Sequence, residues 1–105
     1  MRAGDLTLEL TALAVKHLMS IDAFGAEQWG EERANRYTRR IFTVFEHLRR
    51  HPELGVAHAE YGDGIRTFPV ERHIVVYRLD DATVRILAIP SASANIQAAL
   101  ADDEQ

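Results

Sequence analysis

The pattern of apolar and polar residues divides the chain into a helical first half and a strand-forming second half. Residues 6–10, LTLEL, alternate with period two and predict a short strand. After Thr11, a candidate N-cap, apolar residues recur at helical spacing and predict a helix over residues 12–28, which Gly30 ends. The apolar residues of this pattern are Leu10, Leu13, Ala14, Leu18, Ile21 and Phe24.

A second amphipathic segment predicts a helix over residues 31–50. It has two glutamates near its positive end and two arginines near its negative end, as the helix dipole favours. The dipeptide His51-Pro52 ends it. Two such helices joined by a short glycine turn predict an antiparallel hairpin. The apolar stripe consists of Ala34, Tyr37, Ile41, Val44, Phe45 and Leu48.

Beyond a predicted loop at residues 52–64 the period changes to that of strands. Three segments joined by tight turns predict two hairpins, and the middle one, HIVVYRL, is rich in β-branched and aromatic residues, as a buried strand should be. In chain order, the strands and the turns between them are residues 65–70, Glu71-Arg72, 73–79, 80–82 and 83–89.

The last apolar stretch, SASANIQAALA, predicts a short helix capped by Ser91 or Ser93. The acidic residues that follow oppose the helix dipole, so we expect this end to fray. The predicted order is β-α-α-β-β-β. It describes an α+β fold in which a helical hairpin packs on one face of a mainly antiparallel sheet.

Composition limits the kind of protein that this fold makes. The 105 residues, 47% of them hydrophobic, fit one domain spanning residues 1–105. Cysteine is absent, which excludes disulfides and thiolate metal sites and suits a reducing cytoplasm. No apolar run is long enough for a membrane helix, and the N-terminus is too polar for a secretory signal. The net charge of −4 disfavours non-specific binding to nucleic acid.

Several motifs occur together in a recognisable order. They are AEQWGEE, the PELG loop, FPV, and the RH and YR dipeptides of the next strand. In this order and at this spacing, they resemble the ParE toxins of bacterial type II toxin–antitoxin systems, within the RelE/ParE superfamily. The resemblance covers about residues 6–89 and implies the fold given above. It also implies a toxin that poisons DNA gyrase by protein binding. The implied partner is a ParD-like antitoxin that forms a hetero-oligomer with the toxin, its C-terminal segment folding across the toxin.

The C-terminal segment, residues 90–105, departs from the family pattern. ParE-like chains usually end in a polar segment that contains His, Arg and Asp. Here no titratable side chain lies between Arg85 and Asp102. One alternative to an active toxin is therefore a degenerate one that binds its antitoxin only.

A second alternative is a RelE-like, ribosome-dependent mRNA endonuclease. Such a reaction needs a group that takes the 2′-hydroxyl proton and cations that stabilise the developing charge. Arg66 stands where a phosphate-clamping arginine is expected, with Arg72 and Arg78 nearby, but Ala, Pro, Ser and Asn fill the C-terminal acid and base positions. The sequence therefore favours a protein without catalytic residues. Arg66 and Arg78 have a structural interpretation too, as sheet positions balanced by acidic residues.

The histidines give little support for a metal or cofactor site. His47 and His51 have the i, i+4 spacing of helical metal ligands, yet no acidic residue or cysteine completes a set, so we expect both to be exposed. His73 and Tyr77 share one face of a strand, and we expect them to be half-buried under the second helix. We therefore predict no metal and no cofactor.

The arginine flank of the second helix is the strongest candidate surface. Residues 31–50 carry six arginines and three glutamates, a local charge of +3. By periodicity Tyr37 points into the core, which leaves no aromatic residue between the arginines, whereas single-strand binders interleave the two types. Arginine is favoured at protein interfaces, so we expect an antitoxin segment to fold here as an amphipathic helix followed by an added strand. The alternative is that these arginines only solubilise the domain. The predicted binding residues are Arg33, Arg36, Arg40, Arg66, Arg72 and Arg78.

Overall fold

The computed structural model describes residues 6–101. It has the predicted α+β architecture, with β1 parallel to β5 and the other neighbouring strands antiparallel, in the sheet order β1-β5-β4-β3-β2. The elements are β1 (Thr7–Leu10), α1 (Ala12–Trp29), α2 (Glu31–Arg50), β2 (Val56–Ala57), the 3-10 helix η2 (Ala59–Tyr61), β3 (Ile65–Val70), β4 (His73–Asp80), β5 (Thr83–Ala88) and α3 (Ile96–Ala101).

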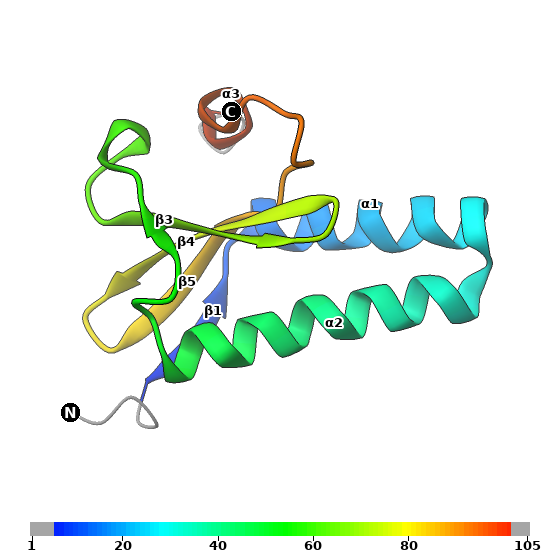
Figure 1. The fold of residues 1–105 in the computed structure, drawn as a ribbon, viewed down its shortest axis with the longest axis horizontal. Coiled ribbons are helices and arrows are strands. Elements are labelled where there is room, and N and C mark those ends of the chain that lie inside the picture. The colour runs from blue at the N-terminus through cyan, green and yellow to red at the C-terminus, as the bar shows by residue number, and fades with distance from the viewer. Residues whose placement is uncertain (1–5, 102–105) are drawn as a thin grey trace.

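The sheet separates two apolar clusters. The α1–α2 hairpin packs on one face, and α3 lies across the other (Figure 1). The period of two along β4 sends Val75 and Tyr77 into the cluster beneath the helices, while Ile74 and Val76 join the cluster that contacts α3. The ends of α1 and α2 that meet at the interhelical turn extend past the sheet (Figure 1). No helix within residues 6–101 is long and apolar enough to span a bilayer.

Both ends of α1 follow from the sequence. Thr11 is the predicted N-cap, and its Oγ1 accepts a hydrogen bond from the Ala14 N–H at 3.1 Å. Gly30 ends the helix with a φ of 90°, a conformation that glycine adopts without a steric cost. One residue of the apolar pattern, Phe24, is 57% exposed. It lies where the helices extend past the sheet, so it packs edge-on against Trp29, with 6.3 Å between ring centroids.

Helix α2 has the predicted bounds and the predicted buried stripe. Ala34, Ile41, Phe45 and Leu48 are buried beneath it, and the helix ends at Arg50.

The segment at residues 52–64 contains two short elements that the sequence pattern did not predict. They are β2, which pairs with β3, and the 3-10 helix η2. Tyr77 anchors the segment, since its hydroxyl donates to the Pro52 carbonyl and accepts from the Gly55 N–H, each at 2.7 Å. Tyr77 is fully buried, so the prediction that it is half-buried was wrong, whereas His73 is half-buried as expected.

The cap of the terminal helix also differs from the prediction. Asn95, not Ser91 or Ser93, accepts a hydrogen bond from the Ala98 N–H at 3.1 Å. The two serine hydroxyls instead lie 3.1 Å from each other. Ser91 forms an isolated bridge with His73, which holds the start of this segment to the sheet and moves the helix start downstream. The acidic residues expected to fray, 102–105, lie outside the described residues.

Candidate functional site

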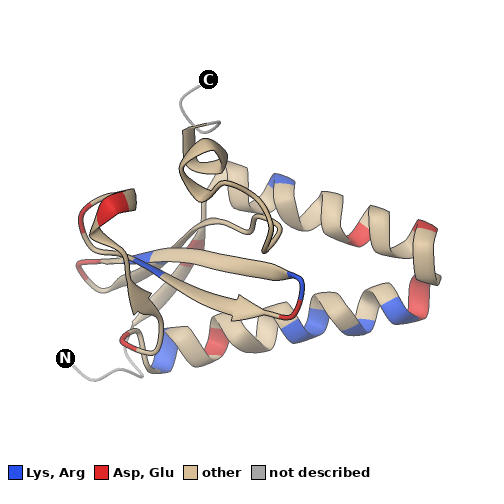
Figure 2. Cartoon of the chain, turned by 45° about the horizontal axis from the view of Figure 1, so that its top comes forward, with Lys and Arg blue, Asp and Glu red and all other residues tan. Residues whose placement is uncertain are grey.

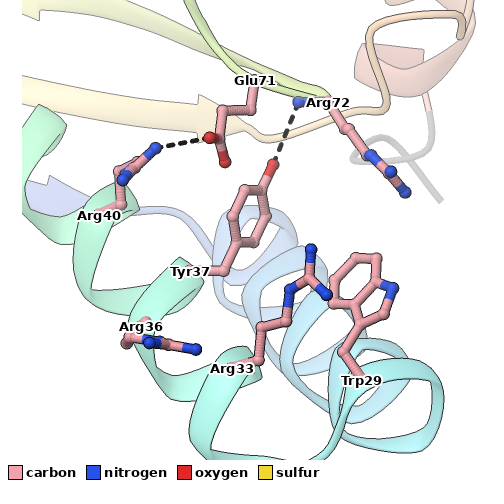
Figure 3. A pocket seen from close by; sticks show the side chains of 7 residues that line it. All are labelled: Trp29, Arg33, Arg36, Tyr37, Arg40, Glu71 and Arg72. Carbon is pink, nitrogen blue, oxygen red and sulfur yellow. Dashed lines mark hydrogen bonds and ion pairs between the residues drawn. The ribbon is translucent and has the colours of Figure 1, made fainter.

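The structure divides the six candidate arginines into two groups. Arg33, Arg36 and Arg40 of α2 and Arg72 of the β3–β4 turn line one shallow hollow of about 390 Å³ (Figure 3). Arg66 and Arg78 lie elsewhere on the sheet. We call the hollow the basic groove; its lining residues are Trp29, Arg33, Arg36, Tyr37, Arg40, Glu71 and Arg72.

Helical spacing and a tight turn build the basic groove. Arg33, Arg36 and Arg40 recur at i, i+3 and i+7, so they share one flank of α2 (Figure 3). The β3–β4 hairpin carries Glu71 and Arg72 at its tip, where Figure 2 shows one acidic and one basic residue beside the α2 arginines.

Tyr37 forms the floor of the groove and ties α2 to the turn. Its hydroxyl donates to the Val70 carbonyl at 3.1 Å and accepts from the Arg72 N–H at 3.3 Å. Burial raises the pKa of Tyr37, against the lowering effect of the Arg72 backbone, so this hydroxyl keeps its proton at neutral pH. The prediction that Tyr37 points into the core is only partly right, because the ring packs at the edge of the core while the hydroxyl reaches the turn.

Trp29 is the groove residue that the sequence reasoning missed. The guanidinium carbons of Arg33 and Arg72 lie 5.6 and 5.3 Å from the centre of its ring, within cation–π range. The prediction that no aromatic side chain stands among these arginines was therefore wrong. Trp29 is the last residue of α1 and Arg33 lies in the first turn of α2, so their closeness across Gly30 in the sequence was the one available signal for this contact.

Glu71 is the second missed residue and the acidic member of the groove. Its carboxylate lies 2.5 Å from the Arg40 guanidinium, with the two side chains 49% and 61% exposed. Its backbone has a φ of 51°, in the left-handed region. The groove therefore holds one internal carboxylate among four guanidinium groups.

Arg66 and Arg78 are both paired with groups of the fold itself. The Nη1 of Arg66 donates to the Gly55 carbonyl at 2.6 Å, which fastens the loop to β3. Arg78 lies 2.8 Å from Asp80, which also contacts Arg85 at 3.1 Å. Hydrogen bonds from Arg78, and then from Arg85, lower the pKa of Asp80.

A second hollow, of about 300 Å³, lies between α1 and the start of the C-terminal segment and includes His17 and His73. The Ile89 N–H donates to the His17 Nδ1 at 2.9 Å, and burial lowers the pKa of His73. His47 and His51 are exposed. No group of three or more histidine, aspartate or glutamate side chains within residues 6–101 is arranged to hold a metal ion.

The chemistry of the basic groove is that of anion recognition. Guanidinium groups stay protonated at physiological pH and present paired donors to carboxylates and phosphates. Neither they nor a protonated tyrosine can remove a proton from a substrate at neutral pH.

Comparisons with known proteins agree with the fold. The family model described as "ParE toxin of type II toxin-antitoxin system, parDE" matches residues 8–96. A solved structure titled "Chromosomal ParDE TA system from P. aeruginosa" superposes with a TM-score of 0.73 at 21% identity, covering 83% of this chain and 96% of that one. No curated protein matches the chain significantly. The family match spans most of the sequence, and the chain therefore belongs to the ParE toxins of type II toxin–antitoxin systems.

Proposed function

We propose that this ParE-family toxin acts in the cytoplasm by binding DNA gyrase and is held inactive by a ParD-like antitoxin. Family membership supports this role. The observation that carries it is the basic groove, which gathers four arginines around one tryptophan. Guanidinium groups this close repel one another, so the groove is suited to a partner that brings negative charge.

We assign the antitoxin contact to Arg33, Arg36, Arg40 and Arg72. Their forked donors and apolar stems are available along the open groove. Of the other two candidate arginines, Arg66 is hydrogen-bonded to loop carbonyls and Arg78 to Asp80. We therefore assign those two to support of the sheet rather than to partner binding.

Two features outside the basic groove favour a non-enzymatic mechanism over RNA cleavage. In an endonuclease of the RelE type, Arg66 was the expected phosphate clamp. Here its guanidinium donates to the Gly55 carbonyl. The chain between Arg85 and Asp102, where further acid and base groups are expected, contains no titratable side chain.

Three assays with purified protein test the proposal. The first is gyrase supercoiling, which we expect the toxin to inhibit and the product of a neighbouring antitoxin gene to restore. The second measures the affinity of that antitoxin for Arg33→Glu, with Arg50→Glu as the matched control. Arg50 lies at the far end of the same helix, 64% exposed and outside the groove.

The third assay, cleavage of ribosome-bound mRNA, separates the alternatives. Antitoxin binding without any effect on gyrase would identify a degenerate toxin. Cleavage of mRNA would overturn the non-enzymatic mechanism. Equal loss of affinity in both arginine variants would remove the groove as the antitoxin contact.

A further inference from the structure

Glu71 occupies a backbone position that suits other residues better. It is the first residue of the two-residue β3–β4 turn, with a φ of 51°. Glycine or asparagine is the usual choice for a left-handed conformation, because most side chains are strained there. The equivalent position of the β4–β5 turn has a φ of 53° and holds Asp81, one of the tolerant residue types. The β3–β4 turn therefore keeps a glutamate despite its backbone preference.

What the glutamate adds is a side chain that reaches the groove. Its Oε1 lies 2.5 Å from the Nη1 of Arg40, whereas the shorter Asp81 forms no ion pair among residues 6–101. Strained residues are commonly retained where their side chain serves a site. The contact is also easily broken, because an ion pair between half-exposed side chains is screened by water.

We propose that Glu71 is an internal stand-in for a partner's carboxylate, and that an acidic polypeptide segment binds the basic groove by displacing it from Arg40. This inference rests on the proposed function only in taking the partner to be a polypeptide. It adds the chemistry of recognition, since glutamate or aspartate side chains of the partner contact Arg40, Arg36 and the Arg33–Trp29–Arg72 stack.

Charge and shape favour a polypeptide over nucleic acid. The whole chain carries a net charge of −4, which repels a long phosphate backbone more strongly than a short acidic segment of few charges. The groove has a single indole, already covered by Arg33 and Arg72, instead of a row of open aromatic faces for stacked bases. In the structure, Arg40 already pairs with a carboxylate, that of Glu71.

Trp29 makes the groove directly observable. It is the only tryptophan in the chain and lies within the groove, so its fluorescence reports occupancy. The probes are a synthetic helix-forming peptide with glutamates at i, i+4 spacing, the same peptide with glutamines, and single-stranded oligothymidine of matched charge. We expect the glutamate peptide alone to shift Trp29 emission and to bind more weakly as salt is raised.

The variant Glu71→Gln tests the stand-in role. It removes the carboxylate while keeping the side-chain length, and we expect the glutamate peptide to bind it about two- to fivefold more tightly, the range that a surface ion pair allows. Glu71→Asn, which suits the left-handed turn, should show the same gain. The matched control is Asp81→Asn, which changes the net charge equally at the equivalent turn and should leave affinity unchanged. Circular dichroism verifies that each variant is folded.

Three results would overturn parts of the proposal. Equal affinities of Glu71→Gln and Asp81→Asn for the glutamate peptide would overturn the stand-in role. A response of Trp29 to oligothymidine but not to the peptide would overturn the polypeptide partner. In the combined variant Arg40→Gln/Glu71→Gln, the gain should vanish, and its persistence would show that Arg40 is not the contested group. None of these readouts involves gyrase, so failure of the proposed toxic activity is scored separately.

Discussion

The hydroxyl of Tyr37 and the Nδ1 of His73 lie 2.7 Å apart, joining α2 to the first residue of β4. The same hydroxyl lies 3.1 Å from the Val70 carbonyl, and when it donates its single proton there, His73 contributes the Nδ1–H tautomer as a donor to the phenol oxygen. With the Arg72 N–H as a further donor, one phenol oxygen has three partners around the β3–β4 turn. This contact places the tip of the hairpin against the arginine flank of α2.

Replacing Tyr37 by phenylalanine should therefore loosen the turn. We expect the free energy of unfolding to fall by about 1–2 kcal/mol, because the hydrogen bonds are lost while the apolar ring remains. Urea denaturation measures the change. The control is Tyr61→Phe, since the Tyr61 hydroxyl has no hydrogen-bond partner identified within residues 6–101. Equal effects of the two substitutions would show that the Tyr37 contacts do not stabilise the turn.

The protonation of His73 should make stability depend on pH. Burial, and then the nearby His17 and Arg72, lower the pKa of His73 from its ordinary value of 6.5. The unfolded chain therefore binds this proton more readily than the folded one, so stability falls as pH drops below about 6.5 and the fall ends below the folded-state pKa. The slope due to one proton stays below about 1.4 kcal/mol per pH unit.

Denaturation at several pH values tests this dependence. His73→Gln should flatten the stability profile between pH 6.5 and the onset of acid unfolding. His51→Gln, at an exposed position, should leave the profile as it is. A profile unchanged by His73→Gln would contradict the assignment.

Gly55 is expected to be intolerant of any side chain. A β-carbon at this position would lie 2.8 Å from the Thr67 carbonyl oxygen and 2.7 Å from Cε1 of the buried Tyr77. Both neighbours are fixed by packing, so Gly55→Ala should lower the free energy of unfolding by about 1–3 kcal/mol. Adding Tyr77→Phe removes the hydroxyl that also crowds the position, so the two changes should be non-additive in thermal denaturation. Strict additivity would mean that the two positions do not meet.

Substitutions of the groove arginines and of the sheet arginines should have different effects on stability and on antitoxin binding. Arg66→Gln breaks a charge-assisted bond to the Gly55 carbonyl and should destabilise the fold by about 1 kcal/mol without changing antitoxin affinity. Arg36→Gln should leave stability within about 0.5 kcal/mol and weaken binding. Denaturation and calorimetric titration of the two variants check this division. The reverse pattern would exchange the assigned roles.

The sequence predicted the elements that are long enough to show a regular pattern of apolar and polar residues. The stripe of Ile41, Phe45 and Leu48 defined α2, and Thr11 and Gly30 marked the limits of α1 correctly. The two-residue strand β2 was not predicted, since two residues show no alternation. Its position depends on hydrogen bonds from Tyr77 and Arg66, on other strands, to Gly55, the residue just before it.

The basic groove was less predictable, because it depends on contacts between elements that are distant in the sequence. Periodicity placed Arg33, Arg36 and Arg40 on one flank, and the structure confirms that they lie together. It could not show that a hairpin tip would carry Glu71 to Arg40, because that contact depends on how the sheet is placed beneath the helix. Helical periodicity also cannot predict the double role of Tyr37. Its ring packs on the core, while its hydroxyl binds the Val70 carbonyl beside the β3–β4 turn.

The parallel pairing of β1 with β5 has a consequence for how the protein is made. Thr7 and Thr83 share a side-chain hydrogen bond across 76 residues, so this edge of the sheet closes only after β5 has been translated. The helical hairpin and the later β-hairpins are local and form earlier. A nascent chain still lacking β5 has no strand with which β1 can pair, and we expect the complete sheet to form only after β5 has left the ribosome.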